Sequence, residues 1–138
     1  MFPDVDPAEH TAGSLRAAYG RALRESIDGT DPTAIADATG LDPDTVRAVV
    51  SGDQPQITLP EAAAIRSTVD GRDAEILVAD ARDEVLLAMS SAVLDVETLT
   101  HRLDGELSAK ELQQKIEGRH PMTLTEYAQV RVVLAEDA

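Results

Sequence analysis

One segment of the sequence gathers side chains that can recognise nucleic acid. Residues 107–120 read LSAKELQQKIEGRH, and this segment holds both lysines of the chain. If a helix follows Ser108, its exposed face and the loop after it carry Lys110, Gln113, Gln114, Lys115, Arg119 and His120. Glutamine pairs with adenine, lysine donates to guanine or phosphate, and arginine contacts the phosphate backbone. The pattern therefore predicts contacts with the base edges and phosphates of double-stranded DNA.

The same segment has a second interpretation. Glu111 and Lys115 are four residues apart, a spacing at which opposite charges stabilise a solvated helix without any ligand. Local charge favours DNA, because residues 101–120 hold equal numbers of basic and acidic residues in a chain whose net charge is −14. The sequence leaves both interpretations open.

Other chemistries have little support. The histidines, His10, His101 and His120, are scattered, and none has a partner at a spacing that makes a convincing metal site. Cysteine is absent, which excludes disulfides, thiolate catalysis and cysteine-bound metals. The sequence has no glycine-rich phosphate loop and no nucleophile elbow, and its carboxylates are dispersed. We therefore expect no enzyme activity, no metal and no cofactor.

The charge balance indicates the environment of the protein. With 26 acidic and 12 basic residues, and only two lysines among the latter, the composition is similar to that of proteins from extreme halophiles. In an ordinary cytoplasm this excess argues against DNA, whose binding requires phosphate neutralisation, but in a halophile it is the default. No apolar run approaches the roughly 20 residues that span a bilayer, and the first residues do not form a secretory signal. We expect a cytoplasmic protein without membrane contact.

The elements that position these residues are predicted to be helices. Ser14 is expected to cap a helix that ends near Ile27, and further helices should begin at Asp31 with Pro32 and at Asp42 with Pro43. A capping box starts another helix at Thr58 and Glu61, and similar boxes occur at Ser108 with Glu111 and at Thr123 with Glu126.

Apolar spacing predicts which helix faces are buried. Val46, Val49 and Val50 should share one buried face. A long helix from about Asp73 to Val93 should form the spine of the molecule. Its predicted buried stripe consists of Ile76, Ala79, Leu86, Met89 and Val93.

A helix-turn-helix pattern is found in residues 39–52, TGLDPDTVRAVVSG. The end of a first helix is followed by a turn at Gly40 and Leu41, and a second helix ends at Gly52. This pattern resembles the Cro/C1-type helix-turn-helix domain of phage repressors. The resemblance implies that the second helix faces DNA, where Thr45, Arg47 and Gln54 are the useful donors and the neighbouring aspartates repel phosphate. A solvated or partner-facing surface is therefore the favoured interpretation of this helix.

A shift of 66 positions superimposes this unit on the second half of the chain. Gly52 falls on Gly118 and Pro55 on Pro121; with one residue dropped, residues 57–59 fall on residues 122–124. Such matches predict an internal duplication. We therefore expect an all-α fold of two pseudo-repeated Cro/C1-like units, residues 7–71 and 72–138, joined by the long central helix into one compact body.

Two functions follow from this organisation. The first is a helix-turn-helix DNA-binding, transcription-regulator-like protein of a halophile, with contacts mainly from the second repeat. The alternative is a helical protein–protein interaction module that derives from such a domain, no longer binds DNA, and contacts a protein partner or a second copy of itself. The composition also suggests a small family confined to halophilic archaea.

Overall fold

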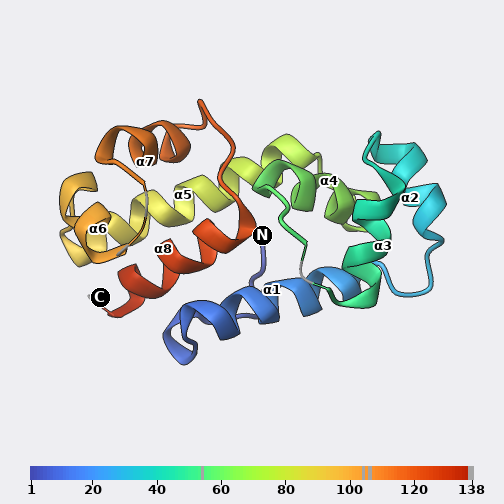
Figure 1. The fold of residues 1–138 in the computed structure, drawn as a ribbon, viewed down its shortest axis with the longest axis horizontal. Helices are drawn as coiled ribbons and strands as arrows, with labels where there is room; N and C mark the ends of the chain where they lie inside the picture. The colour runs from blue at the N-terminus through green and yellow to red at the C-terminus, as the bar shows by residue number, and fades with distance from the viewer. Residues whose placement is uncertain (54, 104, 106, 137–138) are drawn as a thin grey trace.

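The computed structural model describes residues 1–53, 55–103, 105 and 107–136, and this part of the chain is helical without a strand. Eight α-helices follow a short 3-10 turn at Pro7–Glu9 (Figure 1). The all-α prediction is confirmed. The helices are α1 Ala12–Ser26, α2 Pro32–Thr39, α3 Pro43–Ser51, α4 Leu59–Asp70, α5 Ala74–Ala92, α6 Val96–Leu103, α7 Ala109–Ile116 and α8 Leu124–Glu136.

Most of the predicted helix starts are confirmed by their caps. Asp42 Oδ1 accepts from the Asp44 N–H at 2.8 Å, and α3 ends at Gly52, whose φ of 80° suits glycine. The predicted capping boxes are present at the starts of α4 and α7. The prediction for Ser14 is wrong in detail. Thr11 is the cap of α1, and Ser14 is its partner three residues later, because the helix begins at Ala12.

The predicted buried stripe of α5 is wrong. Leu77, Ala81 and Val85 are the buried residues of this helix, whereas the predicted Ile76 and Leu86 are 48% and 47% exposed. The buried residues form an i, i+4, i+8 row, which is a ridge that packs into the grooves of neighbouring helices, here α4 and α8. Apolar residues occupy two faces of α5, so spacing alone could not select the buried one.

Two further residues that were expected to be buried lie at the surface. Val50, at the end of α3, is exposed, unlike Val46 and Val49 on the same helix. Val93 is the C-cap of α5 in the left-handed conformation and is 88% exposed. Both residues stand at helix ends, where the chain turns away from the core.

Helices α1–α4 and α5–α8 pack in matching ways. Within each set the first helix contacts the third and the fourth, and the second contacts the third and the fourth. Between the sets, α1 packs on α8 as α4 packs on α5, so that these four helices form the middle of the molecule, with α2 and α3 at one end of the longest axis and α6 and α7 at the other (Figure 1). This exchange of partners is the arrangement that a duplicated unit with approximate two-fold symmetry would adopt.

The two sets meet at a short backbone pairing. An isolated antiparallel bridge joins Thr58 to Thr123. The Leu59 N–H donates to the Met122 carbonyl, and the Leu124 N–H donates to the Ile57 carbonyl, each at 2.8 Å. These are the residues that the sequence repeat equates, residues 57–59 and 122–124. The pairing is reciprocal, as it must be near a two-fold axis; the duplication itself stays a prediction.

A single hydrophobic cluster draws residues from both predicted units. Its aromatic centre stacks the rings of Phe2 and Tyr19 at 4.6 Å between centroids, and Tyr127 of α8 lies 5.5 Å from Tyr19. None of the helices in the described part of the chain is both long and apolar enough to span a bilayer.

The buried tyrosines make stability sensitive to alkali. Burial raises the pKa of Tyr19 to about 12 from its usual value of 10.0, with smaller and opposing effects of Arg131 and Glu84. Below pH 10 both folded and unfolded chains hold the proton, so that stability is lost as the pH rises from about 10 to 12. The free energy of unfolding should fall by about 1.4 kcal/mol per pH unit for this group. Denaturant titrations across this range test it. The Tyr19→Phe variant should show a shallower slope, and an unchanged slope would refute the assignment.

Candidate functional site

The predicted DNA-contacting residues of the second unit lie on α7 and in the loop after it, but one of them is already occupied. The Lys115 ammonium donates to both carboxylate oxygens of Glu126, at 2.6 and 2.7 Å, and the side chain is only 17% exposed. Glu126 also closes the capping box of α8 by accepting from the Thr123 N–H. The partner of Lys115 is therefore Glu126 instead of Glu111, and a contact between Lys115 and DNA stays a prediction.

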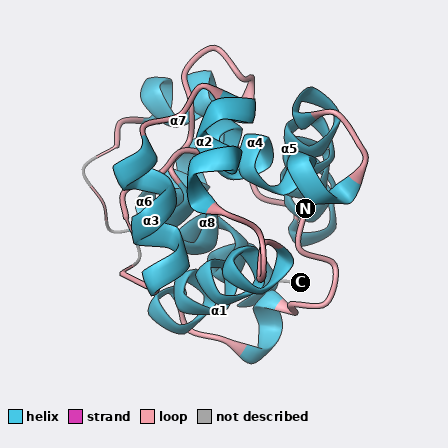
Figure 2. Cartoon of the chain, turned by 90° about the vertical axis from the view of Figure 1, so that its right-hand side faces the viewer, coloured by secondary structure: helices cyan, strands magenta, loops and turns pink. Residues whose placement is uncertain are grey.

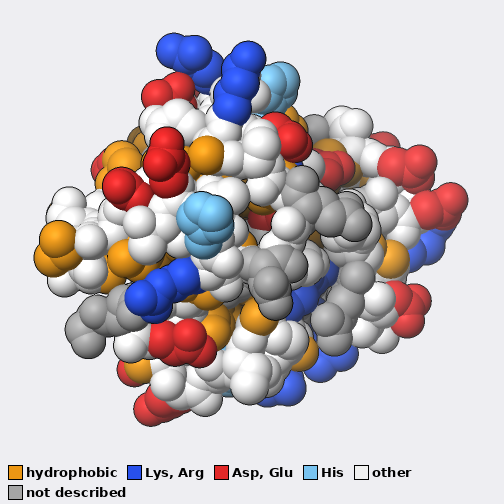
Figure 3. Space-filling view, turned by 60° about the vertical axis from the view of Figure 1, so that its left-hand side comes forward, with side chains coloured by type: hydrophobic (Ala, Val, Ile, Leu, Met, Phe, Trp, Pro, Cys, Tyr) orange, Lys and Arg blue, Asp and Glu red, His pale blue; other side chains and the backbone are white. Residues whose placement is uncertain are grey.

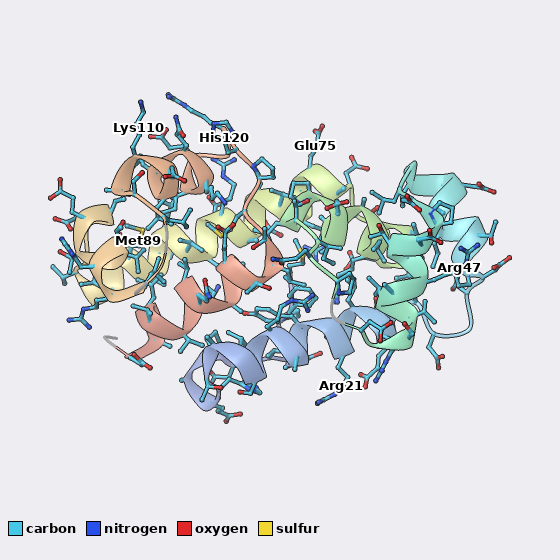
Figure 4. The ribbon with its side chains drawn as sticks, in the orientation of Figure 1. Arg21, Arg47, Glu75, Met89, Lys110 and His120 are labelled. Atoms are coloured by element: carbon cyan, nitrogen blue, oxygen red, sulfur yellow. The ribbon has the colours of Figure 1, made fainter. Side chains whose placement is uncertain are left out.

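Two more of these residues have internal partners. The Gln113 amide donates to Glu117 at 2.7 Å, and the Arg119 guanidinium lies 3.3 Å from the other oxygen of Glu117. Arg119 keeps most of its side chain in solvent. Lys110 and His120 are exposed at the same end of the molecule (Figure 4), while Gln114 is half-buried. Among the predicted DNA-contacting residues that the structure describes here, Lys110 is thus an exposed cation without an ion pair, and Arg119 is an exposed cation paired with Glu117.

The candidate residues of the first unit are far from those of the second. Arg47 pairs with Asp44 at 2.8 Å at the surface of α3, and Thr45 is half-buried. Gln54 lies outside the described residues. Figure 1 places α3 and α7 at opposite ends of the longest axis, so the structure does not gather the predicted DNA-contacting residues into one site.

The charge around α6 and α7 is mixed. Figure 3 shows lysine and arginine side chains standing among aspartate and glutamate side chains on this face, and the basic side chains of the described residues do not form one continuous patch there. Duplex DNA binding depends mainly on many phosphate contacts from clustered basic residues. The face therefore lacks the electrostatic footprint that such binding requires.

The outer face of α5 is the most unusual surface of the molecule. Among the described residues six large apolar side chains are exposed, and four of them belong to α5 or its C-cap: Ile76, Leu86, Leu87 and Val93. Leu87 is 69% exposed. Ala79, Asp83 and Ser90 lie between them on the same face and are also exposed. Because clustered exposed apolar side chains commonly mark interaction sites, the outer face of α5 is a candidate binding surface.

Helix α5 is accessible because of its position. In Figure 2 it lies at the right-hand edge of the molecule, whereas α3, α6 and α7 lie toward the left. Its buried row faces α4 and α8, which leaves the opposite side uncovered. The sequence predicts that the stripe containing Ile76 and Leu86 is buried, whereas in the structure this stripe is the exposed face of α5. The sequence analysis therefore did not identify it as a candidate binding surface.

A family model described as "Family of unknown function (DUF5791)" matches residues 15–137. The chain belongs to this family. The match runs from the first turns of α1 into the last residues of the chain, so that DUF5791 comprises both sets of helices. No curated protein and no solved structure matches the chain. The Cro/C1 resemblance therefore rests on the residues of the helix-turn-helix segment alone.

No metal centre is built by the described residues. Within that part of the chain no group of three or more histidine, aspartate or glutamate side chains is placed to hold an ion. His10 faces Ser14, with 3.0 Å between Nδ1 and Oγ.

Proposed function

We propose that this DUF5791 protein is a helical interaction module, derived from a helix-turn-helix domain, whose α5 outer face binds a second copy of the chain. The observation that carries the proposal is the run of exposed apolar side chains from Ile76 to Val93. Burying Leu87 or Ile76 against a partner removes apolar area from water at about 25 cal/mol per Å². The proposal makes the protein a binding protein of a halophile's cytoplasm, not an enzyme.

The α5 outer face is self-complementary in an antiparallel arrangement. If two copies of α5 cross head to tail about a point between Glu84 and Val85, Ile76 of one copy opposes Val93 of the other. In the same register Ala79 opposes Ser90, while Leu86 opposes Asp83 and Leu87 opposes Arg82, against whose aliphatic stem it can pack. Large side chains then meet at the ends, and the small pair lets the helices approach closely. A two-fold interface requires such self-complementarity, whereas an unrelated partner would not.

Salt should strengthen this association. Each chain carries a net charge of −14, so that two copies repel each other at low ionic strength. At molar salt the screening length falls to about 3 Å, while hydrophobic burial is retained. The composition therefore suits a dimer that forms under halophilic conditions.

Disulfide trapping tests the proposed register, because the chain has no cysteine of its own. Ala79→Cys and Ser90→Cys variants, mixed and oxidised in molar potassium chloride, should form a covalent heterodimer. Either variant alone should cross-link poorly, because the two copies of residue 79 would be about 16 Å apart along the helices. Equal cross-linking in the single-variant samples would refute the antiparallel pairing.

DNA binding is the second candidate, favoured by the exposed Lys110 and Arg119 near His120. It is tested by titrating duplex DNA in molar potassium chloride against the parent and the Lys110→Glu/Arg119→Glu variant. Lys115 is left intact because its reversal would leave Glu126 without its cation. The interaction-module proposal predicts no saturable binding to the parent. Saturable binding that the double reversal abolishes would establish DNA binding at this surface.

A further inference from the structure

A polar cavity of about 170 Å³ opens between α1, the C-terminal end of α3 and the loop that leads to α4. Three arginines of α1 line it: Arg16, Arg21 and Arg24. None of the described lining residues is acidic, although the chain as a whole carries 26 acidic residues. Within the described part of the chain, Arg21 and Arg24 have neither an ion pair nor a hydrogen bond. The cavity is therefore a local concentration of arginine side chains in an acidic protein, although Glu25 lies near Arg21 and Arg24 on neighbouring surfaces.

Arg16 is the buried member of the set. Its side chain is 6% exposed, and its Nη2 donates to the Pro55 carbonyl at 2.8 Å. Its Nη1 is buried and has no partner among the described residues. Burial lowers the pKa of Arg16. An unpaired buried donor on a charged group is costly, and an anion bound close to the guanidinium would offset part of that cost.

The second set of helices provides an internal comparison. The shift of 66 positions places Arg16 on Arg82. Arg82 is held at the end of α7, where its Nε and Nη2 donate to the carbonyls of Ile116 and Glu117 at 3.1 and 2.6 Å. On one side Arg82 lines a cavity of only about 10 Å³, and on the other it borders a hollow of about 290 Å³ that also contains the acidic Glu75.

The comparison separates a structural role from a binding role. In the second set a single arginine, Arg82, donates to the carbonyl groups at the C-terminal end of α7. In the first set three arginines of α1 lie beside the C-terminal end of α3, which is the corresponding helix. The shift puts Arg21 on Leu87 and Arg24 on Ser90, both part of the α5 outer face. The same helix face is therefore basic in the first set and apolar in the second, and helix capping does not account for the extra arginines.

We propose that this cavity, the α1 arginine cavity, binds a phosphate-type oxyanion, either free phosphate or the phosphate group of a monoester. Guanidinium groups offer paired N–H donors that match the oxygens of phosphate, and several of them match its double negative charge. The volume exceeds that of a roughly 150 Å³ cavity that holds benzene, so a phosphate fits with room for water.

Glycine at position 52 contributes to the cavity. A Cβ there would lie 2.7 Å from Arg24 Nη1, closer than real contacts allow. Its absence lets the Arg24 guanidinium lie against the backbone at the end of α3. Arg21 is exposed and stands on the outer edge of α1 (Figure 4), at the rim of the cavity.

Calorimetric titration of inorganic phosphate into the protein in molar potassium chloride tests the proposal. We expect one phosphate per chain, and at least a roughly tenfold weaker affinity in Arg24→Gln, because a charge-assisted contact is lost. Arg21→Gln should weaken binding less. Arg47→Gln, which removes an exposed arginine of α3 outside the cavity, is the matched control and should bind as the parent does. Circular dichroism confirms that each variant is folded.

Arg16 is not substituted, because its bond to Pro55 also holds the loop. Methyl phosphate, titrated in parallel, distinguishes the two sources of the ligand. If it binds, the cavity accepts a monoester; if it does not while phosphate binds, the ligand is the free ion. The proposal is overturned if the parent shows no saturable phosphate binding, or if Arg24→Gln binds as tightly as Arg47→Gln.

Discussion

Leu77→Ala is expected to lower the free energy of unfolding by about 2–5 kcal/mol, the usual cost of a leucine-sized cavity in a core. Leu77 is 0% exposed in the buried row of α5. The matched variant Leu87→Ala lies on the same helix, where the side chain is mostly in solvent. It should change the stability of the single chain by no more than about 0.5 kcal/mol.

Denaturant titration at protein concentrations where sedimentation shows single chains measures both variants without a contribution from association. The contrast tests the rotation of α5 directly. If Leu87→Ala were the costly variant and Leu77→Ala the neutral one, the face of α5 that carries Leu87 would be buried, and the α5 outer face would not exist.

Lowering the salt from molar concentration to about 0.1 M is expected to reduce the melting temperature markedly. The screening length grows from about 3 to about 10 Å, so that repulsion within a chain of net charge −14 reaches across neighbouring surface groups. Differential scanning calorimetry across a potassium chloride series measures the effect.

A variant with fewer surface charges is the control for this salt effect. Glu25→Gln/Asp28→Asn/Glu97→Gln neutralises three exposed carboxylates and should lose less stability at low salt than the parent does. A parent melting temperature that stayed constant across the series would contradict the halophilic interpretation of the composition.

Local chemistry made much of the fold predictable. Helix caps are local interactions, because the capping residue and the backbone groups that it contacts are only a few residues apart. The caps at Asp42 and Thr58 and the end of α3 at Gly52 could therefore be predicted from the sequence. The helix-turn-helix segment is built from such signals. The same holds for the capping box at Thr123, which the sequence repeat had pointed out.

Contacts between distant residues limited the prediction of the site. Lys115 had a plausible partner in Glu111 on its own helix, but the fold brings Glu126 of α8 closer, and the pair is then shielded from water. The rotation of α5 likewise depends on what α4 and α8 present to it. The burial of Arg16 depends on the loop at Pro55. None of these follows from spacing within one helix.

Sedimentation equilibrium in molar potassium chloride tests the central claim that the α5 outer face binds a second copy. The parent should show twice the mass of the 14.7 kDa chain. Leu86→Gln/Leu87→Gln should show the mass of one chain, because two apolar side chains of the interface are lost without a change in charge. The control Val69→Gln, at an exposed apolar residue of α4, should remain a dimer. A parent that sediments as a single chain at every concentration, or a double variant that dimerises as the parent does, would contradict the account.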